Sequence, residues 1–219
     1  MKKVLLFLLG TMLILVSVAA QENNEESSRG KKEASANDDA QRRNFFVGIG
    51  VKGNIYLNND TGNDTELWGK PTLGGRLFVG KWFSQYIAGR IVVDVGHMKP
   101  TFQRRTIMVD SNYGLARLDV MFDVTNCFRT YSPNHFYNMI PYAGIGGAKA
   151  FNAKNRPDKL DGSTSFVYGG GLLNTFRLSE KFSAFLNVGI DLVDAKFDGH
   201  KDKTYNGIVA GTIGMVVNF

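Results

Sequence analysis

The chain has one cysteine, Cys127, among its 219 residues. A lone cysteine cannot form an internal disulfide, and it cannot build a thiolate cluster around zinc or iron. Three histidines, His97, His135 and His200, are scattered along the sequence with no motif connecting them. We therefore expect neither a metal nor a cofactor.

Strong charge of one sign is also missing. The formal net charge is +6, and it drops to +4 without Lys2 and Lys3 of the leader. So modest a charge on a chain of this length gives no reason to expect nucleic acid as a partner. Gly48 and Gly50 form a Gly-x-Gly pair inside a strand pattern with no helix after it, so they are not a nucleotide fingerprint.

Only the first twenty residues contain a long apolar run. Lys2 and Lys3 precede the apolar stretch 4–16, and small residues at 17–20 lead to Gln21. This order predicts a signal peptide over 1–20 that is cleaved near Ala20. No later stretch has ~18 consecutive apolar residues. The exported chain is then a soluble β-protein or a barrel, which crosses lipid with strands and shows no hydropathy peak.

Residues 21–44 contain no aromatic and no large aliphatic side chain. Such a segment cannot bury enough apolar area to offset the entropy lost on ordering. We expect a disordered tail in the periplasm, which acts as a tether or spacer.

From residue 45 onward, apolar residues recur at every second position. The clearest case is the end of the chain, where one face is apolar and ends on an aromatic residue. Its members are Phe219, Val217, Met215, Ile213, Gly211 and Val209. The alternate positions are mostly small or polar, so this segment predicts an amphipathic strand. A terminal strand of this kind resembles the closing strand and assembly signal of bacterial outer-membrane barrels.

The same alternation divides residues 45–219 into segments of the length that a tilted membrane-spanning strand needs. The expected strands are 44–56, 71–82, 86–97, 113–125, 139–151, 164–177, 182–194 and 205–219. Turns at 82–86 and 178–181 are short, and the connections on the other side are long and polar. The prediction is an all-β fold, an eight-stranded antiparallel transmembrane β-barrel. Glycines at 144–147 and 169–171 leave the faces of the fifth and sixth strands unassigned.

Aromatic residues near the strand ends predict two interfacial girdles. The lower set is Phe45, Trp82, Phe83, Phe176, Phe182 and Phe219, and the upper set is Tyr56, Trp68, Tyr113, Phe151, Phe197 and Tyr205.

A resemblance to a known family is carried by Gly80–Phe83 with Tyr86 and Arg90, by Asp119–Asn126 and Pro141–Gly146, and by the terminal strand. The chain resembles the small OmpA/OmpX-like barrels, in particular those of Bacteroidetes outer membranes. The resemblance implies the outer membrane of a Gram-negative bacterium, with its lipids, lipopolysaccharide and the barrel assembly machinery as partners. The peptidoglycan-binding domain that follows the barrel in full-length OmpA has no counterpart in the sequence.

Charged residues fall on the face that would point into the barrel. They are Lys52, Arg76, Arg90, Asp94, Arg117, Asp119, Asp123 and Asp191. An eight-stranded barrel is just wide enough for side chains to fill it, so these charges must pair with one another. We favour a structural plug, and a narrow gated ion path lined by the same groups is the alternative.

The predicted function is structural, with surface loops whose cations contact lipopolysaccharide phosphates, a host molecule or another surface ligand. A small passive porin-like channel is the second hypothesis. The third is an outer-membrane lipid-modifying enzyme, because His97 and Ser111 lie near the outer rim across one loop. No recognisable motif supports catalysis.

Overall fold

The computed structural model describes residues 45–57, 70–99, 101–102, 107–108, 110–128, 135–154, 164–194 and 205–219. The predicted signal peptide, the tail at 21–44 and most of the long loops lie outside these residues.

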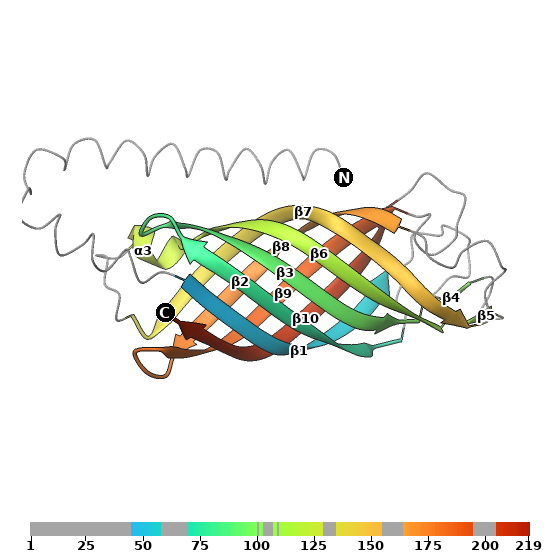
Figure 1. The fold of residues 1–219 in the computed structure, drawn as a ribbon, viewed down its shortest axis with the longest axis horizontal. Helices are drawn as coiled ribbons and strands as arrows, with labels where there is room; N and C mark the ends of the chain where they lie inside the picture. The colour runs from blue at the N-terminus through green and yellow to red at the C-terminus, as the bar shows by residue number, and fades with distance from the viewer. Residues whose placement is uncertain are drawn as a thin grey trace, which may run out of the picture. The chain divides into compact units, whose positions relative to one another are not determined.

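Eight long strands close into an antiparallel barrel, as predicted (Figure 1). They are β1 (Phe45–Leu57), β2 (Thr72–Trp82), β3 (Ile87–Met98), β6 (Asp110–Phe122), β7 (Tyr137–Lys154), β8 (Thr164–Arg177), β9 (Phe182–Asp194) and β10 (Tyr205–Asn218). Each strand pairs with its neighbour along the chain, and β10 pairs with β1, in register from Phe46 opposite Asn218 to Leu57 opposite Gly207. Closure leaves no strand edge, so every strand finds its hydrogen-bond partners within the sheet.

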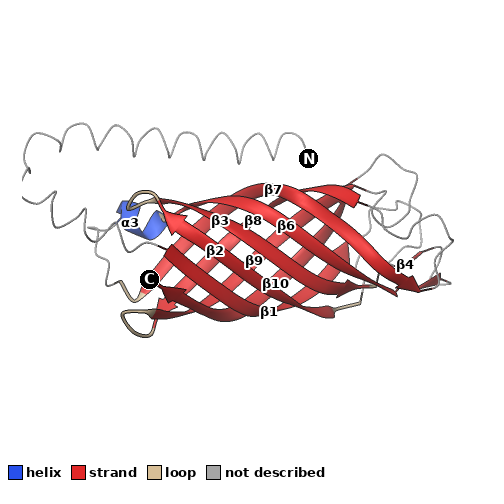
Figure 2. Cartoon of the chain, viewed as in Figure 1, coloured by secondary structure: helices blue, strands red, loops and turns tan. Residues whose placement is uncertain are grey.

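Three short elements complete the described chain. A two-stranded sheet is formed by β4 (Thr101–Phe102) and β5 (Ile107–Met108), and α3 (Val124–Phe128) follows β6. Figure 2 shows that strands dominate, with α3 and the C-terminus at one end of the barrel and β4 at the other. We call these the turn end and the loop end. No helix in the described part of the chain is long and apolar enough to cross a membrane.

The two faces of each strand differ as the alternation predicted. Ile49, Leu73 and Ile213 point outward, with 66%, 74% and 63% of their surfaces exposed, whereas Lys52 and Thr212 point inward and are fully buried. An exposed face of hydrophobic side chains, with charged side chains buried inside, is the reverse of a soluble protein. This inversion is what a barrel surrounded by lipid requires.

The expected girdles include three side chains that the structure places inside the barrel. Tyr56 and Tyr113 are buried, and Trp82 packs against a buried cluster. Each stands an even number of residues from an inward residue on its strand, so strand parity determines its side. Trp68 and Phe197 lie outside the described residues.

The expected fourth strand was placed too late in the sequence. It runs over Asp110–Phe122, and the chain then turns into α3. Phe122 has the same parity as the outward-facing Leu118 and Val120, but it is buried at this transition, because regular alternation ends there.

Apolar side chains form two separate layers inside the barrel. The turn-end layer contains Phe46, Phe78, Ala88, Val92, Met121, Ile140, Tyr142, Leu173, Phe185 and Val216. The loop-end layer contains Tyr56, Met98, Tyr113, Leu115, Ala148, Ala150, Val167, Val193 and Ile208. Most of the charged residues described below come from inward positions between these two layers, and Arg90 stands on β3 between Ala88 and Val92 of the turn-end layer.

Candidate functional site in the barrel interior

Seven charged side chains meet in the middle of the barrel. They are Lys52 of β1, Arg76 of β2, Arg90 and Asp94 of β3, Arg117 and Asp119 of β6, and Asp191 of β9. None has more than 3% of its surface exposed. They are seven of the eight charges that the strand pattern directed inward, and we call them the charged layer.

Asp94 is held by two cations from neighbouring strands. Arg76 and Asp94 are directly opposite each other on β2 and β3. The Arg76 Nε and Nη2 donate to the two Asp94 oxygens at 2.7 Å each. Lys52 Nζ reaches Asp94 Oδ2 at 2.7 Å from β1. The two-pronged contact fixes the orientation of the carboxylate as well as its charge.

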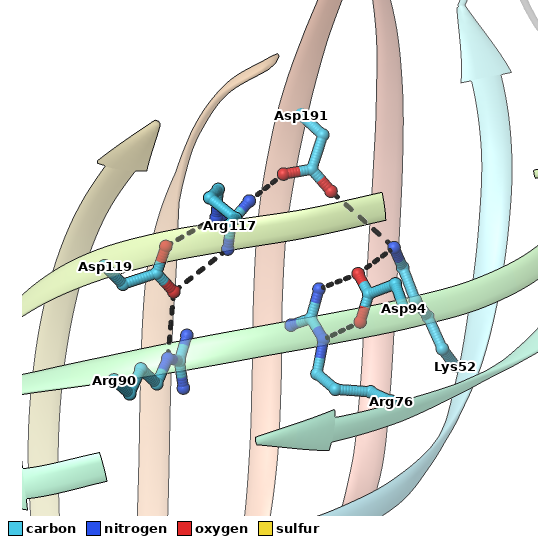
Figure 3. Close-up of polar contacts among 7 residues, drawn as sticks. All are labelled: Lys52, Arg76, Arg90, Asp94, Arg117, Asp119 and Asp191. Carbon is cyan, nitrogen blue, oxygen red and sulfur yellow. Dashed lines mark hydrogen bonds and ion pairs between the residues drawn. The ribbon is translucent and has the colours of Figure 1, made fainter. Parts of the chain in front are cut away.

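Asp191 links this group to a second one across the barrel. Its Oδ2 lies 3.6 Å from Lys52 Nζ, and its Oδ1 accepts a hydrogen bond from Arg117 Nη1. Arg117 also bonds Asp119, whose Oδ2 accepts from Arg90 Nε at 2.9 Å. The result is one continuous chain of ion pairs with alternating sign, from Arg76 to Arg90 (Figure 3).

Aromatic rings cover three of the four cations of the charged layer, namely Lys52, Arg90 and Arg117. The Arg90 guanidinium carbon lies 4.2 Å from the centre of the Tyr142 ring and 5.1 Å from that of Phe78. Arg117 lies 5.4 Å from the Tyr142 ring. Lys52 Nζ is 5.6 Å from the Tyr113 ring, which belongs to the loop-end layer. Cation–π contacts are stronger where water is excluded, so the rings stabilise the charges that they cover.

Glycines at inward positions give the charged layer its space. A side chain at Gly169 would collide with Arg117 and Asp191, and one at Gly144 would collide with Asp119. Gly171 and Gly189 lie against the Tyr142 hydroxyl in the same way. This placement settles the faces of the fifth and sixth expected strands. The sequence held a signal for these faces: glycines recur at every second position of the two strands, and those positions point inward, toward the charged residues of other strands.

Some buried polar atoms have no hydrogen-bond partner among the described residues. They include the Asn54 amide, the hydroxyls of Ser111 and Thr212, and both terminal nitrogens of Arg90. Asn54 and Thr212 stand on β1 and β10 next to Lys52, which is directly opposite Thr212. The interior is therefore polar beyond the ion pairs themselves.

Asp123, the eighth predicted interior charge, lies apart from the charged layer. It follows β6 and is buried at the start of α3, where its Oδ1 accepts from the backbone N–H of Asn126 at 3.2 Å. Its Oδ2 accepts from the Asn126 amide at 3.0 Å. Burial raises the pKa of Asp123 to about 6, although the two backbone hydrogen bonds and the His135 charge act to lower it. Asp123 therefore caps a turn at the end of the barrel.

His97 and Ser111 are not brought together. His97 is on the outward face of β3, and its Nδ1 lies 2.8 Å from the Asn112 amide oxygen. Ser111 is fully buried and belongs to the inward face of β6. The sheet separates the two side chains, so they cannot act as base and nucleophile. Within the described ranges, no group of three or more His, Cys, Asp or Glu residues is placed to hold a metal ion.

No protein-family model matches the chain. Among curated proteins, it is similar to two from Porphyromonas gingivalis. It is 34% identical to outer membrane protein 40 over 148 residues, which are 64% of this chain and 38% of that protein. It is 30% identical to outer membrane protein 41 over 141 residues, which are 63% and 35% of the two chains. The chain thus spans little more than a third of the length of these relatives.

Two solved structures share the fold at low sequence identity. The outer membrane protein OprG of Pseudomonas aeruginosa has a TM-score of 0.55 at 11% identity, over 80% of this chain and 95% of its own. Neisserial surface protein A has a TM-score of 0.50 at 14% identity, over 80% and 97%. The relatives are outer membrane proteins, and the fold is that of small outer-membrane barrels.

Proposed function

We propose that the chain is a structural, surface-exposed barrel protein of a Gram-negative outer membrane, similar to OmpA and OmpX and without catalytic activity. Support comes from the outer-membrane relatives, the lipophilic outer face of the barrel and the predicted signal peptide. Its partners would be the membrane lipids, lipopolysaccharide and the barrel assembly machinery, which reads Phe219, Val217 and Met215. A host or surface ligand would bind the loops, which lie outside the described residues.

The observation that carries this proposal is the filling of the interior. An ion on its way through the barrel would have to pass the turn-end layer, the charged layer and the loop-end layer. In the turn-end layer, the Phe78 and Phe185 rings pack edge to face with centroids 5.3 Å apart. Opening the charged layer would break buried ion pairs, and leaving one partner unpaired costs about 3–5 kcal/mol. A side-chain plug of this kind supports a structural function.

Single-channel recording in planar bilayers tests the proposal. The mature protein is refolded, and its insertion is verified by heat-modifiable gel mobility and by protection of the barrel from protease. We expect inserted wild-type protein to leave the baseline current of the bare bilayer unchanged. Discrete current steps from inserted protein, with an ion selectivity that changes in Asp94→Asn, would overturn the plug.

Glu180→Gln is the matched control, because Glu180 is an exposed carboxylate in the β8–β9 turn and does not belong to the charged layer. A current that changes equally in Asp94→Asn and Glu180→Gln would come from surface charge and not from a lumen.

A small passive channel is the second candidate, and one observation favours it. The polar atoms of Asn54, Ser111 and Thr212 that have no hydrogen-bond partner among the described residues give the interior toward the loop end a lining that water could wet. Under this hypothesis the loop-end layer acts as a gate, and Tyr113→Ala would increase the frequency of current steps. A silent Tyr113→Ala variant would eliminate the channel.

A further inference from the structure

Three polar side chains face the lipid close to the loop end of neighbouring strands. His97 on β3, Asn112 on β6 and Lys149 on β7 all stand at outward positions, with Lys149 exposed and the other two half-buried. Strand parity places them on the same face as Val95, Leu118 and Ile145, which are more than half exposed to the membrane side. We call this group the rim cluster.

The strand pairing brings the rim cluster together. His97 is directly opposite Asn112, and their side chains are hydrogen-bonded at 2.8 Å from Nδ1 to Oδ1. Asn112 is opposite Phe151, and the next outward pair along the same strands is Gly114 and Lys149. Asn112 and Lys149 are therefore diagonal neighbours on β6 and β7. Diagonal neighbours in a sheet are about 7–8 Å apart, so one bound group can reach both.

Gly114 and Phe151 form the floor between the polar side chains. A methyl group added at Gly114 would be in ordinary van der Waals contact with the Phe151 ring, at 3.7 Å. Gly114 itself presents no side chain, so the surface is low at this point. Phe151 keeps 38% of its surface exposed. An apolar ring is thus bordered by an ammonium group, an amide and an imidazole.

The rim is chemically different toward β8 and β10, although β8 pairs directly with β7. Outward positions near the loop ends of β8 and β10 carry Phe166, Tyr168 and Tyr205, and the rings of Tyr168 and Tyr205 pack with centroids 6.3 Å apart. These are ordinary interfacial aromatics. The rim cluster therefore brings an imidazole, an amide and an ammonium group together on three neighbouring strands, whereas aromatic rings are prominent on β8 and β10.

Lys149 forms no ion pair with any residue in the part of the chain that is described. A lysine facing lipid near an interface is tolerated, at a cost of about 0–1 kcal/mol, because its ammonium group reaches the headgroups. The chemical partner available to it there is a headgroup phosphate. Ammonium–phosphate contacts are charge-assisted hydrogen bonds, about twice as strong as neutral ones.

We propose that the rim cluster binds the phosphorylated sugar headgroup of an outer-leaflet lipid, the chemistry found in lipopolysaccharide. Lys149 bonds the phosphate, the Asn112 amide and the His97 imidazole bond sugar hydroxyls or the same phosphate, and the Phe151 ring packs on the sugar. The inference rests on the proposed outer-membrane location, since it requires the loop end to lie in the outer leaflet.

Native mass spectrometry of the refolded barrel tests this proposal. The protein is placed in nanodiscs of zwitterionic phospholipid that contain a small fraction of diphosphoryl lipid A, and the lipid molecules retained on the barrel are counted. Parallel samples contain either the same lipid A without its phosphates or an anionic phospholipid, which separates a phosphorylated sugar from any phosphate-bearing lipid. The variants are Lys149→Ala and Asn112→Ala.

Lys81→Ala is the matched control. Lys81 is the lipid-facing lysine near the turn end of β2, exposed, with its ammonium 5.0 Å from the centre of the Phe45 ring. We expect Lys149→Ala to lower retention of lipid A about tenfold, as the loss of a charge-assisted bond implies. Asn112→Ala should lower it less, and Lys81→Ala should leave it unchanged.

Three outcomes would overturn the inference: equal retention by all variants, an equal loss in Lys81→Ala, or equal retention of the dephosphorylated lipid. Retention of anionic phospholipid as strong as that of lipid A would also overturn it, since the site would then recognise charge alone. A wild-type protein that folds but stays outside the nanodisc would contradict the proposed function instead, so the two failures are distinguishable.

Discussion

At the scale of single residues, the interior depends on where side chains are absent. The charged layer fits into the barrel because Gly144 on β7 leaves room for Asp119, and Gly169 on β8 leaves room for Arg117 and Asp191. Alternation in the sequence was enough to direct seven charges to the same lumen. Alternation could not predict which of these charges pair, because it shows only which face of the sheet a residue lies on. It does not show which side chains on other strands that residue can contact. The Lys52–Asp191 contact joins residues 139 positions apart.

Gly169→Ala tests this dependence. The added methyl group would displace the Arg117 guanidinium and the Asp191 carboxylate, which bond each other beside it. Overpacking combined with a weakened buried ion pair should lower the free energy of unfolding by about 2–4 kcal/mol. Urea unfolding of the refolded barrel in lipid vesicles, followed by tryptophan fluorescence, measures it.

Gly211→Ala is the control for this substitution. Gly211 also lies in a strand, but it faces outward, and an added methyl group would meet nothing within 4 Å. Its effect should stay within about 0.5 kcal/mol. Two glycine variants with the same small effect would mean that the interior rearranges freely around Arg117.

At the scale of elements, strand ends were the least predictable part. The sixth and seventh expected strands, 164–177 and 182–194, have the predicted bounds, and the short turn 178–181 delimits the ends at which they meet. The fourth was shifted, because Asp123, Val124 and Thr125 continue the alternation while the backbone has already turned into α3. The side chains hold this turn: the Asn126 amide donates to the Gln85 carbonyl at 3.1 Å, and the Thr125 hydroxyl accepts from the Met139 N–H at 2.8 Å.

Asp123 gives this turn a dependence on pH. Its pKa is raised from 3.8 to about 6 in the folded protein. Between these values the folded state keeps a proton that the unfolded state has released, so stability falls as the pH rises through this window. The loss amounts to at most about 3 kcal/mol. Asp123→Asn keeps an oxygen for the helix N-cap and carries no charge, so it should remove the dependence.

Urea unfolding midpoints at pH 5 and pH 7.5 measure the effect. Wild-type protein should lose stability between the two values relative to Asp123→Asn, and the variant should be the more stable one at pH 7.5. Asp123→Ala lacks the cap, so it should be less stable than Asp123→Asn at both pH values. A wild-type protein with the same pH profile as Asp123→Asn would contradict the raised pKa.

At the scale of the whole molecule, the sequence predicted the closed barrel and the direction of its charges, but not the division of its interior into layers. Phe78 and Tyr113 carry the same inward parity as Arg76 and Arg117, so alternation treats them alike. Their separation into apolar and charged layers depends on the stagger of neighbouring strands. The stagger is set when the barrel closes, through the register in which β1 pairs with β10.

The end of the closing strand β10 allows the stability of the folded barrel to be tested separately from its assembly in cells. Phe219 donates its backbone N–H to the Phe45 carbonyl at 2.8 Å, and its side chain is 64% exposed. Phe219→Ala keeps this bond and empties no buried space, so the unfolding free energy of the refolded barrel should change by less than about 0.5 kcal/mol. Assembly in cells should fall severalfold if the terminal aromatic is the signal that the assembly machinery reads. Comparing urea midpoints with the amount of heat-modifiable barrel in outer-membrane fractions tests both parts.

Equal assembly of the Phe219→Ala variant and the wild type would show that Phe219 is not part of the assembly signal. A large loss of stability in the variant would show that the Phe219 side chain has a structural function instead.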